Sequence, residues 1–444
     1  VPMIVLTGAV DPDEALTYTH QVLDHQAVFR PITKATFQLT PGGAGLIAEK
    51  AVAVATEPRQ GPVHIDVPIS VADAPSAPHP ARRPAAVPAV PCGTTLSTLV
   101  SWISEAERPV AIVGLDVLQE GSEADVGAFL EKHQIPFITT YKAKGFLPEI
   151  HPLCLGAAGL SPLADTRLVP FVRDADLVLS LGYDPIEMRV GWRDPWDPAQ
   201  QRVVDIAAVP NRHYMHQATL NHVGHVGATA AAIGEMATPR ARWISGAATE
   251  LNARLKADFP HDDDWGPAAV IAEARAVLPD TTLATADSGA HRILLSQMWD
   301  CYAPRQLIQS SALCTMGCAV PMAIGEALVA PERPVISFSG DAGLLMVAGE
   351  LSTALELGVK PIFLVFVDAS LALIELKQRQ RHMTNRGVEF DRHDYAAIGR
   401  AFGGQGATVR SRPELRAALE SALAADTFTV IAAEIDRESY DGKF

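Results

Sequence analysis

Two aspartates follow apolar segments at a spacing that could place both carboxylates in one site. Residues 335–338 and 362–367 are short apolar runs that end close to Asp341 and Asp368, and residues 344–357 between them carry apolar side chains at helical spacing. Strand, helix and strand in this order predict a right-handed βαβ unit with parallel strands. The C-terminal ends of such strands meet at the edge of the sheet where ligands bind.

This pair of carboxylates predicts a cation site that also receives phosphate. Mg²⁺ takes one or two carboxylates and completes its octahedron with waters and phosphate oxygens. Gly340 and Gly343 flank Asp341 at a predicted helix N-terminus, whose free N–H groups favour phosphate. Two alternatives remain open. Asp341 and Asp368 could serve only as a helix cap and a turn residue, or they could form an acidic phosphoacceptor pocket.

Three α/β segments are predicted to position these residues. The chain has 444 residues, which predicts two or three domains. We assign them to residues 1–70, 95–237 and 255–444, with a Pro- and Ala-rich linker at 71–94. Alternating strand and helix patterns predict an α/β fold of three doubly wound parallel-sheet domains, of which the first is only partly present.

Hydrophobic patterns predict the main elements of each segment. Residues 1–8 are expected to form a buried strand in the interior of a sheet, with more chain before it. The other predicted strands are 62–67, 109–113, 137–140, 177–181, 202–205, 283–286, 335–338, 362–367 and 428–435, and predicted helices include 13–23, 42–55, 344–357 and 412–424.

The overall composition excludes several classes of function. The net charge of −15 argues against binding to nucleic acid and to anionic membranes. No apolar run reaches about 18 residues, and no basic segment followed by an apolar one opens the chain. Five cysteines are spread thinly, so we expect core-filling thiols and a reducing, cytoplasmic location.

Two further patterns mimic binding sites. Gly43–Ala48 fits GxGxxA and Asp66 follows about 20 residues later, as in a dinucleotide-binding fingerprint. The preceding residues 35–40 are short and polar, so a helix start followed by an ordinary strand is favoured. Four histidines at 213, 216, 222 and 225 lack the helical spacing and acidic third ligand of a metal site, and their segment is predicted to be surface loop.

The residues around the two aspartates resemble the thiamine-diphosphate motif that begins Gly-Asp-Gly and ends Asn-Asn. In that family the Asp, the later Asn and a backbone carbonyl two residues on bind Mg²⁺. The resemblance therefore implies Asp341, Asp368 and Ser370 as metal ligands. Ala342 replaces the usual Gly, and Asp368 replaces Asn, which keeps an oxygen ligand and adds a negative charge. Mg²⁺ binding is expected to survive both changes.

The similarity extends to the acetolactate synthase branch of these enzymes, the catabolic type that works without FAD. The segments that carry it are residues 29–34, 61–68, 181–187 and 311–321. It implies that Met316 props the cofactor into its bent shape, with plain core packing as the alternative. The other implied cofactor contacts are Gly289, Ala290, His291, Leu313, Gly340, Asp341, Ala342, Gly343, Asp368 and Ile374.

The resemblance departs at the front of the chain. Family members carry about a hundred more residues before the position of Val1, including the Glu that activates the cofactor. No Glu here takes that role, since Glu14 and Glu49 lie downstream of it and are expected at the surface. The catalytic residue is therefore unknown. A homodimer or homotetramer is implied, with Phe29 and Lys34 facing a neighbouring subunit's site.

The chemistry implied is thiamine-diphosphate- and Mg²⁺-dependent decarboxylation of pyruvate with carboligation to 2-acetolactate. The cofactor carries this chemistry and the protein positions it. Three alternatives stay open: another enzyme of the same branch, such as a keto-acid decarboxylase or acyl transferase; an inactive homologue that only binds the cofactor; and a nucleotide sensor that uses Gly43–Ala48.

Overall fold

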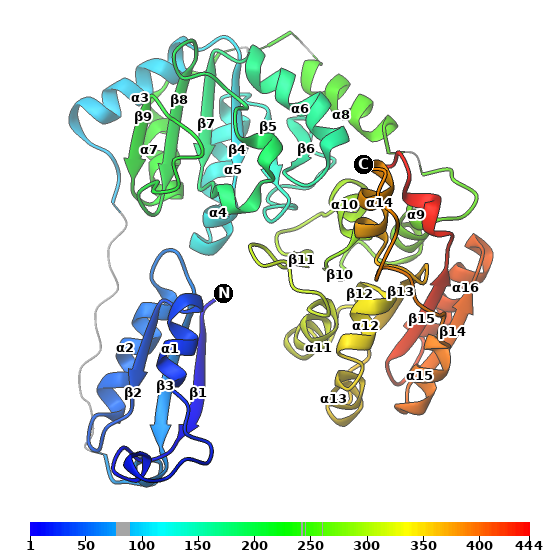
Figure 1. Ribbon diagram of the computed structural model, residues 1–444. Helices are drawn as coiled ribbons and strands as arrows, with labels where there is room; N and C mark the ends of the chain where they lie inside the picture. The colour runs from blue at the N-terminus through cyan, green and yellow to red at the C-terminus, as the bar shows by residue number, and fades with distance from the viewer. Residues whose placement is uncertain (77–88, 241–242, 245, 260) are drawn as a thin grey trace. The chain divides into compact units, whose positions relative to one another are not determined.

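The computed structural model of the chain describes residues 1–76, 89–240, 243–244, 246–259 and 261–444. The chain divides into two compact units, Val1–Pro88 and Ala89–Phe444. The second unit contains two six-stranded sheets (Figure 1). The predicted linker at 71–94 has its central residues, 77–88, outside the described residues.

The first unit is a three-stranded parallel sheet in the order β1-β3-β2. Its elements are β1 (Met3–Ala9), α1 (His25–Phe29), β2 (Ala35–Gln38), α2 (Ala44–Thr56) and β3 (Pro62–Pro68). The core is small, and its buried members are Ala51, Ala55, Val63 and Ile65. All of them come from α2 and the central strand β3.

Two predictions for this unit are wrong. Residues 1–8 do not form a buried interior strand, because β1 lies at the edge of the sheet with Met3 55% and Leu6 66% exposed. The helix expected over 13–23 is reduced to a 3₁₀ turn at Glu14–Leu16. Helix α1 starts only after Asp24, whose side chain accepts a hydrogen bond from the N–H of Ala27 at 2.9 Å.

The central domain is a parallel sheet in the order β6-β5-β4-β7-β8-β9, the doubly wound arrangement in which the order reverses between β4 and β7. Its strands are β4 (Pro109–Val113), β5 (Phe137–Thr140), β6 (Cys154–Ala158), β7 (Leu177–Leu181), β8 (Arg202–Ala207) and β9 (Leu220–Val223). Its helices are α3 (Gly93–Glu105), α4 (Leu115–Glu120), α5 (Glu123–Lys132), α6 (Pro162–Asp174), α7 (Val226–Met236) and α8 (Ala247–Ala257). The sequence patterns missed the two outermost strands, β6 and β9.

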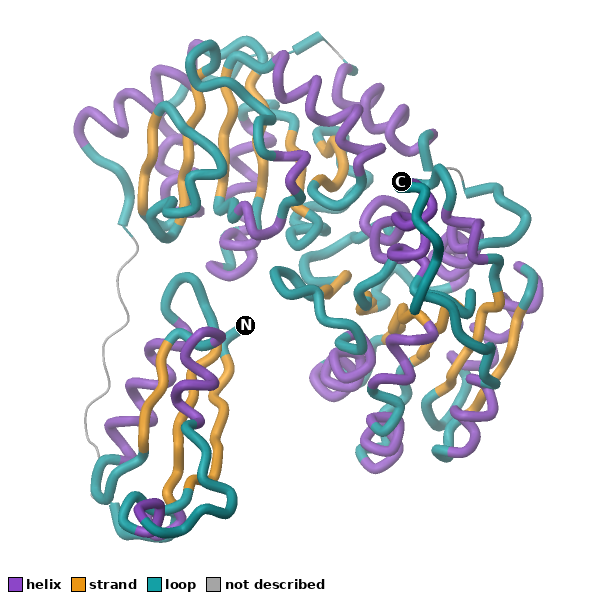
Figure 2. The backbone as a smooth tube through the Cα atoms, in the orientation of Figure 1, coloured by secondary structure: helices purple, strands orange, loops and turns teal. Residues whose placement is uncertain are grey.

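The third domain is a second parallel sheet, in the order β11-β10-β12-β13-β15-β14. Its strands are β10 (Leu283–Ala286), β11 (Leu307–Gln309), β12 (Val335–Gly340), β13 (Ile362–Val367), β14 (Gln405–Val409) and β15 (Thr429–Glu434). Its helices are α9 (Pro267–Val277), α10 (Ala290–Met298), α11 (Ala319–Val329), α12 (Asp341–Met346), α13 (Glu350–Glu356), α14 (Ala372–Gln380), α15 (Tyr395–Ala401) and α16 (Arg412–Leu423). Helices flank both six-stranded sheets (Figure 2). The sheets confirm the predicted α/β class with doubly wound parallel strands.

The helix predicted over 344–357 is interrupted. Helix α12 ends at Met346 and α13 begins at Glu350, so residues 347–349 form a break. Gly349 lies at this break, where its low helix propensity favours an end. Val347 is also turned toward Gly317, where a methyl group would lie 2.8 Å from its side chain. Val347 therefore packs against Gly317 at the point where the helix is interrupted.

The central and third domains share a hydrophobic core that joins Val110 and Ile112 to Trp299 and Phe338. Within the described residues, none of the helices has the length and apolarity that a membrane crossing needs.

Candidate cofactor site at the edge of the third sheet

The two aspartates singled out from the sequence lie together at the C-terminal edge of the third sheet. Strands β12 and β13 pair in parallel, with Gly340 opposite Phe366. Asp341 therefore begins α12 one residue beyond the first strand, and Asp368 follows the second. Both side chains are buried, with 2% and 5% of the residue exposed.

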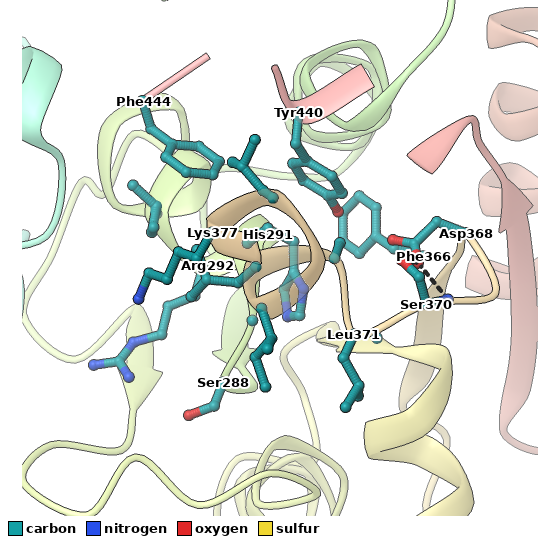
Figure 3. Close-up of a pocket in the computed structure, with 18 of the residues that line it drawn as sticks. Ser288, His291, Arg292, Phe366, Asp368, Ser370, Leu371, Lys377, Tyr440 and Phe444 are labelled. Carbon is teal, nitrogen blue, oxygen red and sulfur yellow. Dashed lines mark hydrogen bonds between the residues drawn. The ribbon is translucent and has the colours of Figure 1, made fainter. Parts of the chain in front are cut away.

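Backbone N–H groups orient both carboxylates. The Oδ1 atom of Asp341 accepts a bond from the N–H of Ala342 at 2.8 Å, and its Oδ2 accepts from Ala369 at 2.7 Å. Asp368 Oδ1 accepts from the N–H of Ser370 at 2.9 Å and from its hydroxyl at 2.8 Å (Figure 3). Ala369 has a φ of +57°, a conformation that costs a non-glycine residue energy. This conformation forms the turn in which the N–H groups of Ala369 and Ser370 reach the two carboxylates.

The electrostatics of this pair favour a cation. Burial, followed by the charge of Asp341, raises the pKa of Asp368 to about 7. Burial also raises the pKa of Asp341 to about 6, against the hydrogen bonds from backbone N–H groups that lower it. Across the described ranges, no group of three or more His, Cys, Asp or Glu could hold a metal alone. A metal here would take its remaining ligands from carbonyl, water or phosphate oxygens, as Mg²⁺ does.

A cavity of about 660 Å³ adjoins the two aspartates. Most of the residues predicted to contact the cofactor line it: Gly289, Ala290, His291, Met316, Gly340, Asp341, Ala342, Gly343, Asp368, Ser370 and Ile374. Leu313 is the exception, because its side chain is 81% exposed and it is absent from the described lining. A contact through the backbone around Leu313 stays a prediction.

A close approach between two segments shapes one wall of the cavity. A methyl group on Gly343 would lie 2.1 Å from Asp287 Oδ2, so only glycine fits there. The same carboxylate accepts bonds from the N–H groups of Gly317 at 2.8 Å and Cys318 at 3.2 Å. Asp287 thus ties the segment that carries Met316 to the start of α12. Its sequence signal was only its place in a strand-to-helix turn.

His291 lies in the middle of the lining and is uncharged. Burial, followed by the charge of Arg292, lowers its pKa to about 3. Its ring stacks on Phe366 with centroids 5.1 Å apart, and its Nε2 has no hydrogen-bond partner among the described residues. A neutral imidazole with a free nitrogen can therefore meet a polar atom of a ligand (Figure 3).

Several lining residues had no functional signal in the sequence. Tyr440 and Phe444 come from the last residues of the chain, and Arg189 follows the 181–187 motif in the central domain. Arg292 and Lys377 come from α10 and α14. Only the fold brings these segments to one cavity.

The dinucleotide-like pattern of Gly43–Ala48 and Asp66 is explained by contacts within the first unit. Asp66 Oδ1 accepts a bond from the Thr7 hydroxyl at 2.6 Å and lies 2.8 Å from His25 Nδ1. As predicted, α2 and then β3 follow the glycines, although the polar residues 35–38 do form a strand, β2.

The histidine segment is not simply surface loop, which corrects the prediction. His216 is 6% exposed and lies 2.8 Å from the Tyr183 hydroxyl. His222 belongs to β9, and His225 Nδ1 caps α7 by accepting from the N–H of Ala228 at 3.2 Å.

Comparisons with known proteins match this architecture. Residues 287–433 match the family model "Thiamine pyrophosphate enzyme, C-terminal TPP binding domain", and residues 96–233 match "Thiamine pyrophosphate enzyme, central domain". An X-ray structure from Mycobacterium smegmatis, assigned as a thiamin diphosphate-dependent enzyme, superposes with a TM-score of 0.80 at 21% identity, covering 98% of this chain and 82% of that one. At this identity the structural likeness shows the fold alone.

Curated relatives align over nearly the whole chain. The acetolactate synthase of Bacillus subtilis is 28% identical over 98% of this chain and 78% of its own length. The catabolic acetolactate synthase of Raoultella terrigena is 26% identical, over 98% and 79%. The acetolactate synthase isozyme 1 large subunit of Escherichia coli is 29% identical, over 99% and 78%. The chain thus spans about four fifths of the length of these relatives. The chain belongs to the thiamine pyrophosphate-dependent enzymes, as an acetolactate synthase-like member whose cofactor is thiamine diphosphate.

Proposed function

We propose that this enzyme decarboxylates pyruvate, a 2-keto acid, and joins the remaining two-carbon unit to a second pyruvate to give 2-acetolactate. The observation that carries the proposal is the pair of buried carboxylates beside a 660 Å³ cavity, in a chain whose relatives over 98% of its length are acetolactate synthases. Thiamine diphosphate, when bound, supplies the nucleophilic carbon and the electron sink that this decarboxylation requires.

Different residues of this chain would bind the metal, the diphosphate and the ring system of the cofactor. Asp341, Asp368 and the carbonyl of Ser370 would hold Mg²⁺, since carboxylate and carbonyl oxygens are its preferred ligands. The N–H groups at the start of α10, from Gly289 on, would receive the diphosphate. Met316 would support the ring system from the opposite segment.

The remaining lining is largely apolar and would limit the access of water to a bound substrate. Phe366, Leu371, Leu376, Tyr440 and Phe444 all line the cavity. A low-dielectric wall of this kind strengthens the electrostatic interactions that act on the substrate.

The group that activates the cofactor is not assigned. Among the described residues that line the cavity there is no glutamate. Glu14 opens a 3₁₀ turn and Glu49 lies within α2, both in the first unit, and the proposal gives neither a catalytic role.

The active form is proposed to be a cytoplasmic homodimer or homotetramer. Phe29 and Lys34 of the first unit are proposed to face a neighbouring subunit's site. Within the chain, Phe29 stacks on His64 with centroids 4.3 Å apart, and Lys34 Nζ donates to the carbonyl of Glu57 at 2.9 Å.

The test is turnover of pyruvate by the protein loaded with thiamine diphosphate and Mg²⁺. We expect release of CO₂ and formation of 2-acetolactate, which NMR of the products would detect. Asp341→Ala should lose both products. Acetaldehyde or an acyl transfer product in place of 2-acetolactate would indicate another enzyme of the same branch. Cofactor binding without CO₂ release would indicate an inactive homologue, and NAD(P) binding by calorimetry would indicate a sensor.

A further inference from the structure

Asp341 and Asp368 form a buried pair of carboxylates that no side chain of the described residues neutralises. Only 2% and 5% of these two residues are exposed. Among the residues that the structure describes, no Lys, Arg or His lies within ion-pair distance of either carboxylate; Arg437 pairs instead with Glu389 at 2.9 Å. When both aspartates are ionised, the pair therefore carries two negative charges that the protein does not compensate.

Both carboxylates reach the same turn, residues 368–370. The N–H of Ala369 donates to Asp341 Oδ2 at 2.7 Å. The N–H and the hydroxyl of Ser370 donate to Asp368 Oδ1 at 2.9 and 2.8 Å (Figure 3). Asp368 Oδ2 accepts no hydrogen bond among the described residues. A carboxylate has about four acceptor positions, so both side chains are oriented and still have lone pairs for a cation.

The position of this turn is set by the third domain itself. Strands β12 and β13 pair in parallel up to Gly340 and Phe366, directly before the two aspartates. Beyond the strands, Ser370 forms a bridge with Glu389, and the N–H of Leu371 donates to the carbonyl of Val388 at 2.7 Å. A cation would thus meet two carboxylates that the fold already holds together, which lowers the cost of binding.

The number of charges decides what such a pair can bind. A divalent cation between two carboxylates forms a neutral site, and it also removes the repulsion between two buried anions. With one carboxylate and one neutral oxygen ligand, the bound cation would keep a net positive charge. The affinity of oxygen sites for hard divalent cations rises with the number of charged ligands. Two carboxylates can therefore hold the cation before an anionic ligand arrives.

We propose that Asp341 and Asp368 bind the divalent cation in the absence of thiamine diphosphate, so that the cation is loaded first and the diphosphate binds to the loaded site. This inference rests on the metal assignment within the proposed function and adds the order of loading. It depends on a departure of this chain from the family motif, which has a neutral Asn at the position of Asp368.

The same extra charge has the opposite effect on the diphosphate. A neutral metal site attracts an anion less strongly than a site with a net positive charge. By linkage, the factor by which the cofactor tightens cation binding equals the factor by which the cation tightens cofactor binding. This coupling factor should accordingly be smaller in the wild type than in Asp368→Asn.

The first test is binding of Mn²⁺ to the full chain freed of cofactor. Mn²⁺ takes the same oxygen ligands as Mg²⁺, and the EPR signal of the free ion is lost on binding. At about 0.15 M salt, which screens exposed charges, Asp368→Asn should bind Mn²⁺ at least about tenfold more weakly than wild type. Asp341→Asn should show the same loss, because both charges are required. Equal affinity in wild type and Asp368→Asn would overturn the proposal.

The second test repeats the titration with saturating thiamine diphosphate. Asp368→Asn should now bind Mn²⁺ within a few-fold of wild type, because the diphosphate supplies the missing negative charge. The gain in Mn²⁺ affinity on adding the cofactor should therefore be about tenfold larger in the variant than in wild type. A loss of the same size with and without the cofactor would overturn the proposal, because the charge of Asp368 would then not determine the order of loading.

Thermal unfolding without cofactor provides the folding check. In EDTA, Asp368→Asn should unfold at the same temperature as wild type or higher, because one of two repelling charges is gone. Mn²⁺ should raise the unfolding midpoint of wild type and leave that of the variant nearly unchanged. An equal rise in both proteins would contradict the proposal.

A matched control tests for unspecific binding to this acidic chain. Asp262 is exposed and belongs to a run of three aspartates, 262–264, in the segment before α9. Asp262→Asn should leave both Mn²⁺ affinity and the unfolding midpoint unchanged. A loss of affinity there equal to that in Asp368→Asn would assign the binding to general negative charge and overturn the site.

The outcomes separate this inference from the proposed reaction. Mn²⁺ binding requires no turnover, so absence of pyruvate turnover alone would defeat the proposed reaction and not the order of loading. A wild type that binds Mn²⁺ only when thiamine diphosphate is present would defeat the order of loading and not the proposed reaction.

Discussion

At the residue scale, the position of Asp368 is the most informative. Its carboxylate is held by the N–H and hydroxyl of Ser370, and it faces the equally buried carboxylate of Asp341. Burial, followed by the charge of Asp341, raises the pKa of Asp368, and a cation bound between the two carboxylates would offset the repulsion. The extra negative charge at this position thus favours the metal-bound form.

Asp368→Ala should weaken binding of thiamine diphosphate in the presence of Mg²⁺ by at least about tenfold, because it would remove a proposed metal ligand. Asp368→Asn is the matched control, since the amide keeps an oxygen ligand and the shape of the side chain. It should bind the cofactor within a few-fold of wild type. Calorimetry at fixed Mg²⁺ measures both variants, and unchanged affinity in Asp368→Ala would refute the metal assignment.

Glu187 makes a second prediction at this scale. Burial raises its pKa to about 7 from an ordinary value of 4.5, with a smaller contribution from the charge of Asp184. The folded state therefore binds the proton more tightly than the unfolded state. This tighter proton binding contributes up to about 3 kcal/mol to the free energy of unfolding. The contribution is fully present below pH 4.5 and is lost as the pH rises through about 7.

Glu187→Gln should remove this dependence, because the neutral amide can accept from the N–H of Leu115 and donate to the Thr140 hydroxyl. Urea unfolding at pH 5 and pH 8 is the measurement. The variant should gain stability relative to wild type at pH 8 and little at pH 5. Equal differences at both pH values would rule out a protonated Glu187.

At the element scale, the loop after β5 is joined to the segment after α10. Glu149 Oε2 accepts from the N–H of Cys301 at 2.8 Å, and the N–H of Glu149 donates to the Cys301 carbonyl at 3.0 Å. Lys144 Nζ pairs with Glu149 Oε1 at 2.6 Å, and both side chains are almost fully buried. The bonds between Glu149 and Cys301 join the two domains whose residues line the cavity, and Lys144 balances the buried charge of Glu149.

Lys144→Met should destabilise the second unit by about 3 kcal/mol, because it leaves the Glu149 carboxylate buried without its cation. The double variant Lys144→Met/Glu149→Gln removes that charge and keeps an acceptor for the Cys301 N–H. It should recover much of the loss in denaturant unfolding. If the double variant were as unstable as the sum of the two single variants, the coupling energy would be zero and the two side chains would not act as a pair.

At the scale of the whole molecule, the first unit exposes apolar side chains that a stable assembly would cover. Met3, Ile4 and Leu6 of the edge strand β1 are 55%, 39% and 66% exposed. The described core of this unit is limited to a few side chains of α2 and β3. A unit with a small core needs further burial of apolar surface to be stable, and association between subunits can supply it.

The holoprotein should therefore run as a dimer or tetramer in multi-angle light scattering at micromolar concentration. Leu6→Glu should shift the distribution toward smaller species, because it places a charge on the exposed apolar edge. The exposed Leu423 of α16 offers a control position in the other unit, where Leu423→Glu should leave the distribution unchanged. A monomeric wild type would contradict this prediction.

The sequence alone determined the βαβ unit and its two aspartates. Buried parallel strands are continuous apolar runs, and their ends carry the ligand-binding residues, so local pattern was sufficient for β12, β13, Asp341 and Asp368. Local pattern failed for β9 and β14, since edge strands such as LNHV and QGATV carry polar residues and are paired on one side only. It also failed at residues 347–349, where Val347 turns toward Gly317.

Only the tertiary structure decided the other half of the cavity. Arg292, Gln309 and Tyr141 come from separate elements of two domains, and nothing in the spacing of these residues relates them. Arg292 is buried and its Nη2 has no hydrogen-bond partner among the described residues, and both are properties of packing. Periodicity along a chain reports which side of an element is buried, whereas the partners of a buried charge depend on contacts between distant segments.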